Sequence, residues 1–86
     1  MTESQQDAQS IFTAFRDIIV ESTGYDPEEI TLDSDIAGEL AVDSLSLVEI
    51  SVRAEDSFGV HIDDEAAASF HTVGDAVTYI HSKLAS

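Results

Sequence analysis

The chain has 86 residues, enough for one small core, and 43% of them are hydrophobic, which suffices for folding. Its formal net charge is −15, with 18 acidic residues against three basic ones, and such a field repels nucleic acids and anionic membranes. Without cysteine, the chain has no disulfide, no thiolate metal ligand and no thiol nucleophile of its own. We expect one domain over residues 1–86, a monomer that attracts basic protein partners.

The N-terminal segment lacks a basic and apolar signal pattern, and no apolar run approaches the roughly 18 residues of a membrane span. The sequence therefore predicts a cytoplasmic protein without membrane insertion.

The first predicted helix runs from Ser4 to about Glu21, with Thr2 or Ser4 as its cap and Gly24 as its stop. Its apolar residues recur at helical spacing and form one stripe: Ala8, Ile11, Phe12, Phe15, Ile18 and Ile19. Asp26 and Pro27 then predict a short helical turn, capped by the aspartate and anchored by Ile30 and Leu32. An acidic loop follows.

The second main helix is predicted from Ser44 to Phe58, with Asp43 as its cap and Gly59 as its end. The acids 63–65 open a short helix through residues 66–68, with Phe70 as its anchor, and a last helix is predicted over 73–84. The predicted fold is all-α, a small bundle of three longer helices and one short helix.

The second helix carries two apolar stripes at about 100° per residue. The first is its core face, with Leu47, Ile50, Ala54 and Phe58. The second lies nearly opposite and consists of Leu45, Val48 and Val52, with Glu55 on one edge and Glu49 and Asp56 on the other. An apolar ridge between carboxylates suits protein docking, because apolar atoms give contact energy and acids orient a basic partner. The alternative is that the acidic loop covers these three residues.

Ser44 is the candidate functional residue, because the predicted helix exposes its hydroxyl at the first turn while Asp43 can act as the cap. An anion attached there would lie near the positive end of the helix dipole. The docking stripe begins at the next residue, so a partner bound to the stripe would reach Ser44.

The Asp43-Ser44-Leu45 element, the following Val48-Glu49 pair and the acidic surroundings closely resemble acyl carrier proteins, over about residues 11–84. In that family the serine is esterified by 4'-phosphopantetheine, whose thiol carries acyl groups as thioesters. The resemblance implies that Ser44, as the covalent attachment point, and Asp43 beside it are the cofactor-binding residues. The resemblance implies that the chain is not an enzyme and serves fatty acid biosynthesis, or a specialised polyketide or lipid pathway. Its implied partners are a phosphopantetheinyl transferase and acyl transferases, ketosynthases and other synthase enzymes with basic patches.

For partner docking, the residues and the resemblance together predict a surface of Leu45, Val48, Val52, Glu39, Glu49, Glu55 and Asp56. Acyl chains would fold back between the helices, with Phe58, Ile62, Phe70 and Ala76 as candidate lining residues.

Three other interpretations use the same residues. A lipase-like nucleophile lacks the glycine before the aspartate, where Val42 stands, and 86 residues leave little room for a pocket and oxyanion hole. An EF-hand beginning at Asp33 lacks two required ligands, at Ala37 and Ser44, so we expect no metal site. The remaining alternative is a non-covalent acidic interaction module whose serine is never modified.

Overall fold

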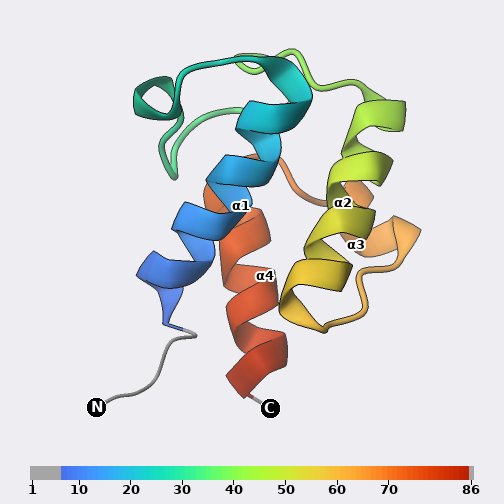
Figure 1. The fold of residues 1–86 in the computed structure, drawn as a ribbon. Coiled ribbons are helices and arrows are strands. Elements are labelled where there is room, and N and C mark those ends of the chain that lie inside the picture. The colour runs from blue at the N-terminus through green and yellow to red at the C-terminus, as the bar shows by residue number, and fades with distance from the viewer. Residues whose placement is uncertain (1–6, 86) are drawn as a thin grey trace.

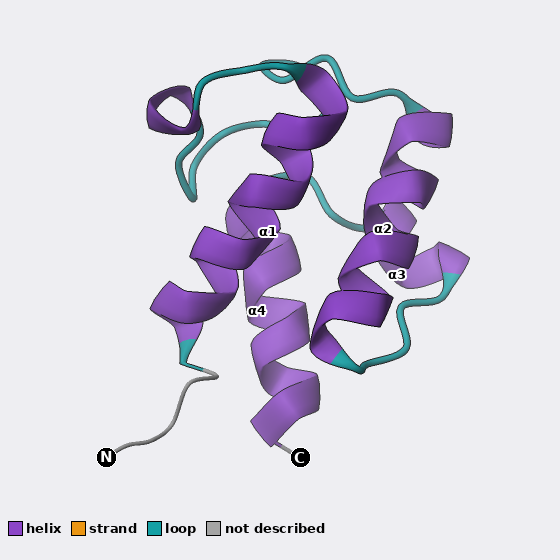
Figure 2. Cartoon of the chain, viewed as in Figure 1, coloured by secondary structure: helices purple, strands orange, loops and turns teal. Residues whose placement is uncertain are grey.

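The computed structural model describes residues 7–85, which form four α-helices and one short 3-10 helix (Figure 1). Helix α1 (Ala8–Thr23) runs antiparallel to α2 (Ser44–Phe58) and α4 (Val73–Ala85) and packs against both. The 3-10 helix η1 (Pro27–Glu29) follows α1, and the short helix α3 (Asp64–Ala68) packs against α2. Figure 2 shows only helices and loops in the described part. The predicted all-α bundle of three longer helices and one short helix is confirmed.

An aspartate caps the N-terminus of three of the helices. Asp7, Asp43 and Asp63 lie just before α1, α2 and α3, and each carboxylate accepts the backbone N–H three residues later, at 2.9, 2.8 and 2.8 Å. Each bond satisfies a donor that has no partner within its helix. Gly24 and Gly59 end α1 and α2 with φ of 86° and 71°, a left-handed conformation that glycine adopts without steric cost. The predicted bounds of α2 and both of its caps are confirmed.

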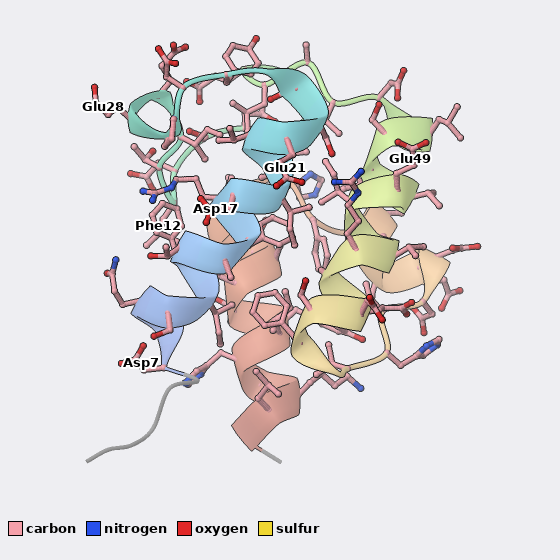
Figure 3. The ribbon with its side chains drawn as sticks, in the orientation of Figure 1. Asp7, Phe12, Asp17, Glu21, Glu28 and Glu49 are labelled. Carbon is pink, nitrogen blue, oxygen red and sulfur yellow. The ribbon has the colours of Figure 1, made fainter. Side chains whose placement is uncertain are left out.

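The predicted start of the first helix at Ser4 is wrong. Asp7 has an extended backbone with ψ of 170° and acts as the N-cap, so α1 begins at Ala8 (Figure 3). Thr2 and Ser4, the predicted caps, lie outside the described residues. Asp7 caps the helix because its carboxylate reaches the N–H of Ser10.

Two details of the predicted short turn also differ. The side chain of Asp26 makes no capping hydrogen bond to η1. Ile30 is buried, as predicted, but the side chain of Leu32 is 49% exposed. Leu32 contributes its backbone instead, because its carbonyl oxygen accepts the N–H of Gly74 at 2.8 Å.

The core lies between α1, α2 and α4 and takes further residues from the long loop. The fully buried side chains of the helices include Ile11, Ile19, Ile50 and Ile80. The loop contributes Ile36, Leu40 and Val42, which are at most 4% exposed. These loop residues bury apolar area at about 25 cal/mol per Å², which holds the loop against the helices.

The long loop is also held by hydrogen bonds to the start of α4. Ile36 donates its N–H to the carbonyl of His71 at 2.9 Å, and Val73 donates to the carbonyl of Ser34 at 3.1 Å. At Gly74 the two backbones approach so closely that a Cβ atom would lie 3.0 Å from the carbonyl oxygen of Leu32. The loop therefore reaches the start of α2 along a fixed path.

Candidate functional site

Ser44 is the first residue of α2, at the end of the bundle where the long loop crosses from α1 (Figure 1). Its side chain is exposed, and its hydroxyl makes no hydrogen bond within residues 7–85. The first N–H groups of a helix have no partner in the helix itself, and the helix dipole is positive at this end. An exposed hydroxyl thus lies where an attached anion is stabilised.

Asp43 performs the capping that would otherwise engage Ser44. Its carboxylate accepts the N–H of Ser46 at 2.8 Å, and this hydrogen bond holds the pKa of Asp43 below its usual range. A carboxylate with a lowered pKa is a weak proton acceptor. Asp43 is therefore a structural cap beside Ser44, and its geometry does not make it a base toward the hydroxyl.

The backbone just before this cap is strained. Ala41 has a φ of 54°, and it is the one non-glycine residue with positive φ among residues 7–85. A Cβ atom in this conformation crowds the following carbonyl oxygen, at a cost of roughly 1–2 kcal/mol. The conformation turns the chain so that the buried Val42 is followed by the exposed Asp43 and Ser44.

The apolar ridge of Leu45, Val48 and Val52 is open to solvent. These side chains are 72%, 43% and 56% exposed, so the acidic loop does not cover them. On the opposite face of α2, Ile50 and Ala54 are fully buried, while Leu47 and Phe58 are half-buried. The helix therefore presents an apolar surface beginning one residue after Ser44.

The four acids predicted for docking fall into two groups. Glu49 and Asp56 are exposed and make no hydrogen bond or ion pair within residues 7–85, and Figure 3 shows Glu49 on α2. Glu39 and Glu55 bind the chain itself: Glu39 accepts the N–H of Asp35 at 3.0 Å, and Glu55 accepts the N–H of Ile62 at 2.6 Å. Only the first group has both carboxylate oxygens available to a partner.

One basic residue interrupts the acidic surface of α2. Arg53 donates to the carboxylate of Glu21 on α1 at 3.0 Å, and their side chains are 54% and 71% exposed. Such an exposed pair contributes at most about 1 kcal/mol to stability. Sequence reasoning did not find this pair, because no local pattern relates residues 32 positions apart.

A small apolar pocket opens beside Ser44 between α2 and α3. Its volume is about 110 Å³, and it is lined by Ser44, Leu47, Val48, Asp64, Ala67 and Ala68. It is smaller than the roughly 150 Å³ apolar cavity that holds a benzene molecule. The candidate lining residues Phe58, Ile62, Phe70 and Ala76 do not line it, because the last three are buried in the core. The small side chains of Ala67 and Ala68 leave this space open. The sequence contains these alanines, but they were not predicted to line a pocket.

Within residues 7–85, no group of three or more histidine or acidic side chains is placed to hold a metal ion. In the same part of the chain, every helix is too short or too polar to cross a bilayer.

The fold and the site together define a carrier domain: an exposed serine at a helix N-terminus, an apolar ridge beside it and a small pocket behind it. The hydroxyl has no internal hydrogen bond to break, so it fits an attached phosphodiester. Residues 13–80 match the protein family described as "Phosphopantetheine attachment site". The chain belongs to the acyl carrier protein family, whose prosthetic group is covalently attached 4'-phosphopantetheine.

Similar proteins agree with this family. The chain is 49% identical over 72 residues to a meromycolate extension acyl carrier protein of Mycobacterium leprae, which covers 84% of this chain and 63% of that protein. It is 44% identical over 72 residues to an acyl carrier protein of Rhodococcus erythropolis, covering 84% and 79%. The match thus spans less than two thirds of the mycobacterial relative.

A solved structure also matches the fold. The acyl carrier protein of Enterococcus faecalis superposes with a TM-score of 0.76 at 33% identity, covering 88% of this chain and 96% of that one. The family and the bundle fold predicted from the sequence are therefore confirmed.

Proposed function

We propose that this protein carries acyl intermediates as thioesters on a 4'-phosphopantetheine arm esterified to Ser44, for fatty acid biosynthesis. The observation that carries the proposal is the exposed Ser44 hydroxyl, which has no hydrogen bond within residues 7–85 and lies at the N-terminus of α2. The family supports the prosthetic group, and the geometry supports this serine as its attachment point.

The chain contributes position and charge, and other proteins contribute the chemistry. Because it has no cysteine, the thiol that forms the thioester must belong to the attached arm. The Ser44 hydroxyl has no hydrogen-bonded base within residues 7–85, so a phosphopantetheinyl transferase would activate it for attack on coenzyme A. The protein is a carrier that acyl transferases, ketosynthases and other synthase enzymes act on in turn.

Docking of these enzymes would use the apolar ridge and its acids. Leu45, Val48 and Val52 would make the contact, while Glu49 and Asp56 would pair with basic side chains of the partner. Charge complementarity raises the association rate more than the affinity, which suits a carrier that must exchange partners. Glu39 and Glu55 would pair with the partner through the carboxylate oxygen that makes no internal hydrogen bond.

The pocket between α2 and α3 would shield part of the acyl chain. Each buried methylene gains about 0.8 kcal/mol. The pocket has a volume of only about 110 Å³, so an acyl chain that exceeds this volume requires α2 and α3 to separate. Shielding therefore depends on how firmly α3 is held.

The names of the similar proteins indicate which class of pathway this carrier would serve. Several are meromycolate extension acyl carrier proteins and others are acyl carrier proteins without further description, which supports fatty acid extension. A specialised lipid or polyketide pathway is the second candidate, favoured by the departure at Arg53 from an otherwise acidic helix.

Intact mass after incubation with coenzyme A and a phosphopantetheinyl transferase tests the attachment. The account predicts a gain of one phosphopantetheinyl group in the natural chain and in Ser46→Ala, and no gain in Ser44→Ala. Ser46 is the matched control because it lies two residues away on the same helix. An unchanged natural chain with an active transferase would instead favour the non-covalent module.

A further inference from the structure

Glu55 connects α2 to the segment that leads into α3. Its Oε2 atom accepts the N–H of Ile62 at 2.6 Å and lies 3.1 Å from Nδ1 of His61. We call these two contacts the Glu55 clasp. One oxygen of its carboxylate, Oε2, thus binds the chain itself, unlike the carboxylates of Glu49 and Asp56, and the Glu55 side chain is only 27% exposed.

The Glu55 clasp stabilises α3, a helix too short to be stable alone. Helix α3 has five residues, too few to be stable without anchors. It is anchored by the buried Ile62 before it, by the cap of Asp63 and by the buried Ala67 within it. The Glu55 clasp fixes the first of these anchors, because the N–H of Ile62 would otherwise lose its acceptor in a half-buried place.

The element held in this way forms one wall of the pocket beside Ser44. Asp64, Ala67 and Ala68 of α3 face Leu47 and Val48 of α2 across the pocket. A change in the position of α3 therefore changes the pocket directly. Val48 lies on the ridge as well, so the docking surface and the pocket share this residue.

The clasp can also be reached from the docking side. Val52, Arg53, Glu55 and Asp56 together line a shallow surface hollow of about 390 Å³. A lysine or arginine of a partner seated on Val52 would meet the Glu55 carboxylate in this hollow. The two internal contacts use Oε2, while Oε1 makes none, so a partner cation can pair with Oε1 and draw the carboxylate away from Ile62 and His61.

We propose that Glu55 is a positioning residue that couples partner docking to release of the acyl chain. A cationic side chain of the docked partner draws the carboxylate away from the α2–α3 connection, α3 loosens, and the pocket beside Ser44 opens. The inference rests on the proposed carrier function. By linkage, a chain that fills the pocket and a partner that pulls on Glu55 oppose each other, so each lowers the affinity of the other.

The test uses the chain loaded with an octanoyl-phosphopantetheine group on Ser44. Neutral hydroxylamine cleaves an exposed thioester faster than a shielded one, so the cleavage rate reports how well the pocket holds the chain. We expect several-fold faster cleavage in Glu55→Ala, which removes the acceptor of the Ile62 N–H, than in the natural protein. Asp56→Ala, at the neighbouring acid without internal contacts, is the matched control and should cleave at the natural rate.

A loss of overall stability must be separated from this local effect. Asp7→Ala removes the cap of α1, far from the pocket, and lowers stability without touching the clasp. It should leave the cleavage rate unchanged. Backbone hydrogen exchange at Ile62 and Ala67 should accelerate in Glu55→Ala but not in Asp7→Ala under conditions where both proteins remain folded.

The coupling itself is tested by adding a saturating amount of the transferase, used only as a docked partner. Cleavage should accelerate in the natural protein and show little further acceleration in Glu55→Ala. Equal rates in the natural protein and Glu55→Ala, or equal responses to the transferase, would overturn the inference. Failure to load Ser44 at all would instead overturn the proposed function, so the two failures are distinguishable.

Discussion

The carboxylate of Asp43 accepts the backbone N–H of Ser46 at 2.8 Å, and this single hydrogen bond leaves the intervening Ser44 hydroxyl available. A serine at the start of a helix commonly caps it and is then occupied. Here the residue before it has that role, so the serine is displaced by one position into the first turn. Asp43 therefore caps the helix, and Ser44 is left as the residue that we propose is modified.

The cap predicts a specific pH dependence. The pKa of Asp43 is lowered in the folded protein by the N–H of Ser46, so the cap stabilises above about pH 4, the ordinary pKa of an aspartate. This stabilisation is lost as the pH falls through the lower folded pKa. Asp43→Ala should therefore melt a few degrees below the natural protein at neutral pH, and the difference should shrink in acid.

Asp43→Asn is the matched control, because asparagine caps helices without titrating in this range. Thermal unfolding followed by circular dichroism at several pH values measures both variants. A difference between the natural protein and Asp43→Ala that stays constant down to about pH 3 would contradict the assigned cap.

The strained backbone at Ala41 predicts how glycine and valine at this position change the free energy of unfolding. Glycine removes a strain of roughly 1–2 kcal/mol at positive φ but adds about 0.4–1 kcal/mol of unfolded-chain entropy. Ala41→Gly should thus gain about 0.5 kcal/mol, and Ala41→Val should lose more than about 1 kcal/mol because a β-branched side chain is worse at this φ. Because residue 41 is exposed, packing does not obscure the comparison. Urea unfolding measures it, and a valine variant as stable as alanine would refute the assignment.

Much of this fold could be predicted from the sequence because its helices have strong local signals. Asp43 and Gly59 bound α2 where the capping rules place them, and the two stripes of the helix separate into buried Ile50 and exposed Leu45 as the helical angle requires. Ser44 was found for the same reason, since its exposure follows from a local cap.

What could not be predicted depends on contacts between distant residues. The Arg53–Glu21 pair and the use of Glu55 by Ile62 join separate elements, so Glu55 was predicted as a docking acid alone. The exposure of Leu32 follows from a loop-to-helix backbone contact that no periodicity reports. The start of α1 was misplaced because Thr2, Ser4 and Asp7 are all capping residues, and the local sequence does not distinguish which of them caps the helix.

Because the ridge is exposed, a substitution there should weaken partner docking without much effect on the free energy of unfolding. Leu45 is 72% exposed, so Leu45→Ala should change the free energy of unfolding by no more than about 0.5 kcal/mol. If the ridge is the docking surface, the same change should lower kcat/KM of the transferase by roughly tenfold, the effect of losing an interface contact worth above 1 kcal/mol. Leu32→Ala is the control, because Leu32 is exposed but belongs to the long loop beside the start of α4 and not to α2. Equal kinetics in both variants would argue against docking there.

The charge of the chain predicts that salt stabilises it. A net charge of −15 on 86 residues opposes compaction, and raising the ionic strength to about 0.15 M shortens the screening length to roughly 8 Å. The melting temperature should rise by several degrees with either sodium chloride or magnesium chloride. A melting temperature that responds to neither salt would show that the acids do not strain the fold.

The most direct test of the account is the position of the prosthetic group in protein purified from cells that produce it. Trypsin should release residues 17–53 as one peptide, which contains Ser44 and four other serines, Ser22, Ser34, Ser46 and Ser51. Fragmentation of this peptide should place the phosphopantetheinyl mass on Ser44. Placement of that mass on another residue, or a peptide that is never modified although the cells contain an active transferase, would contradict the account.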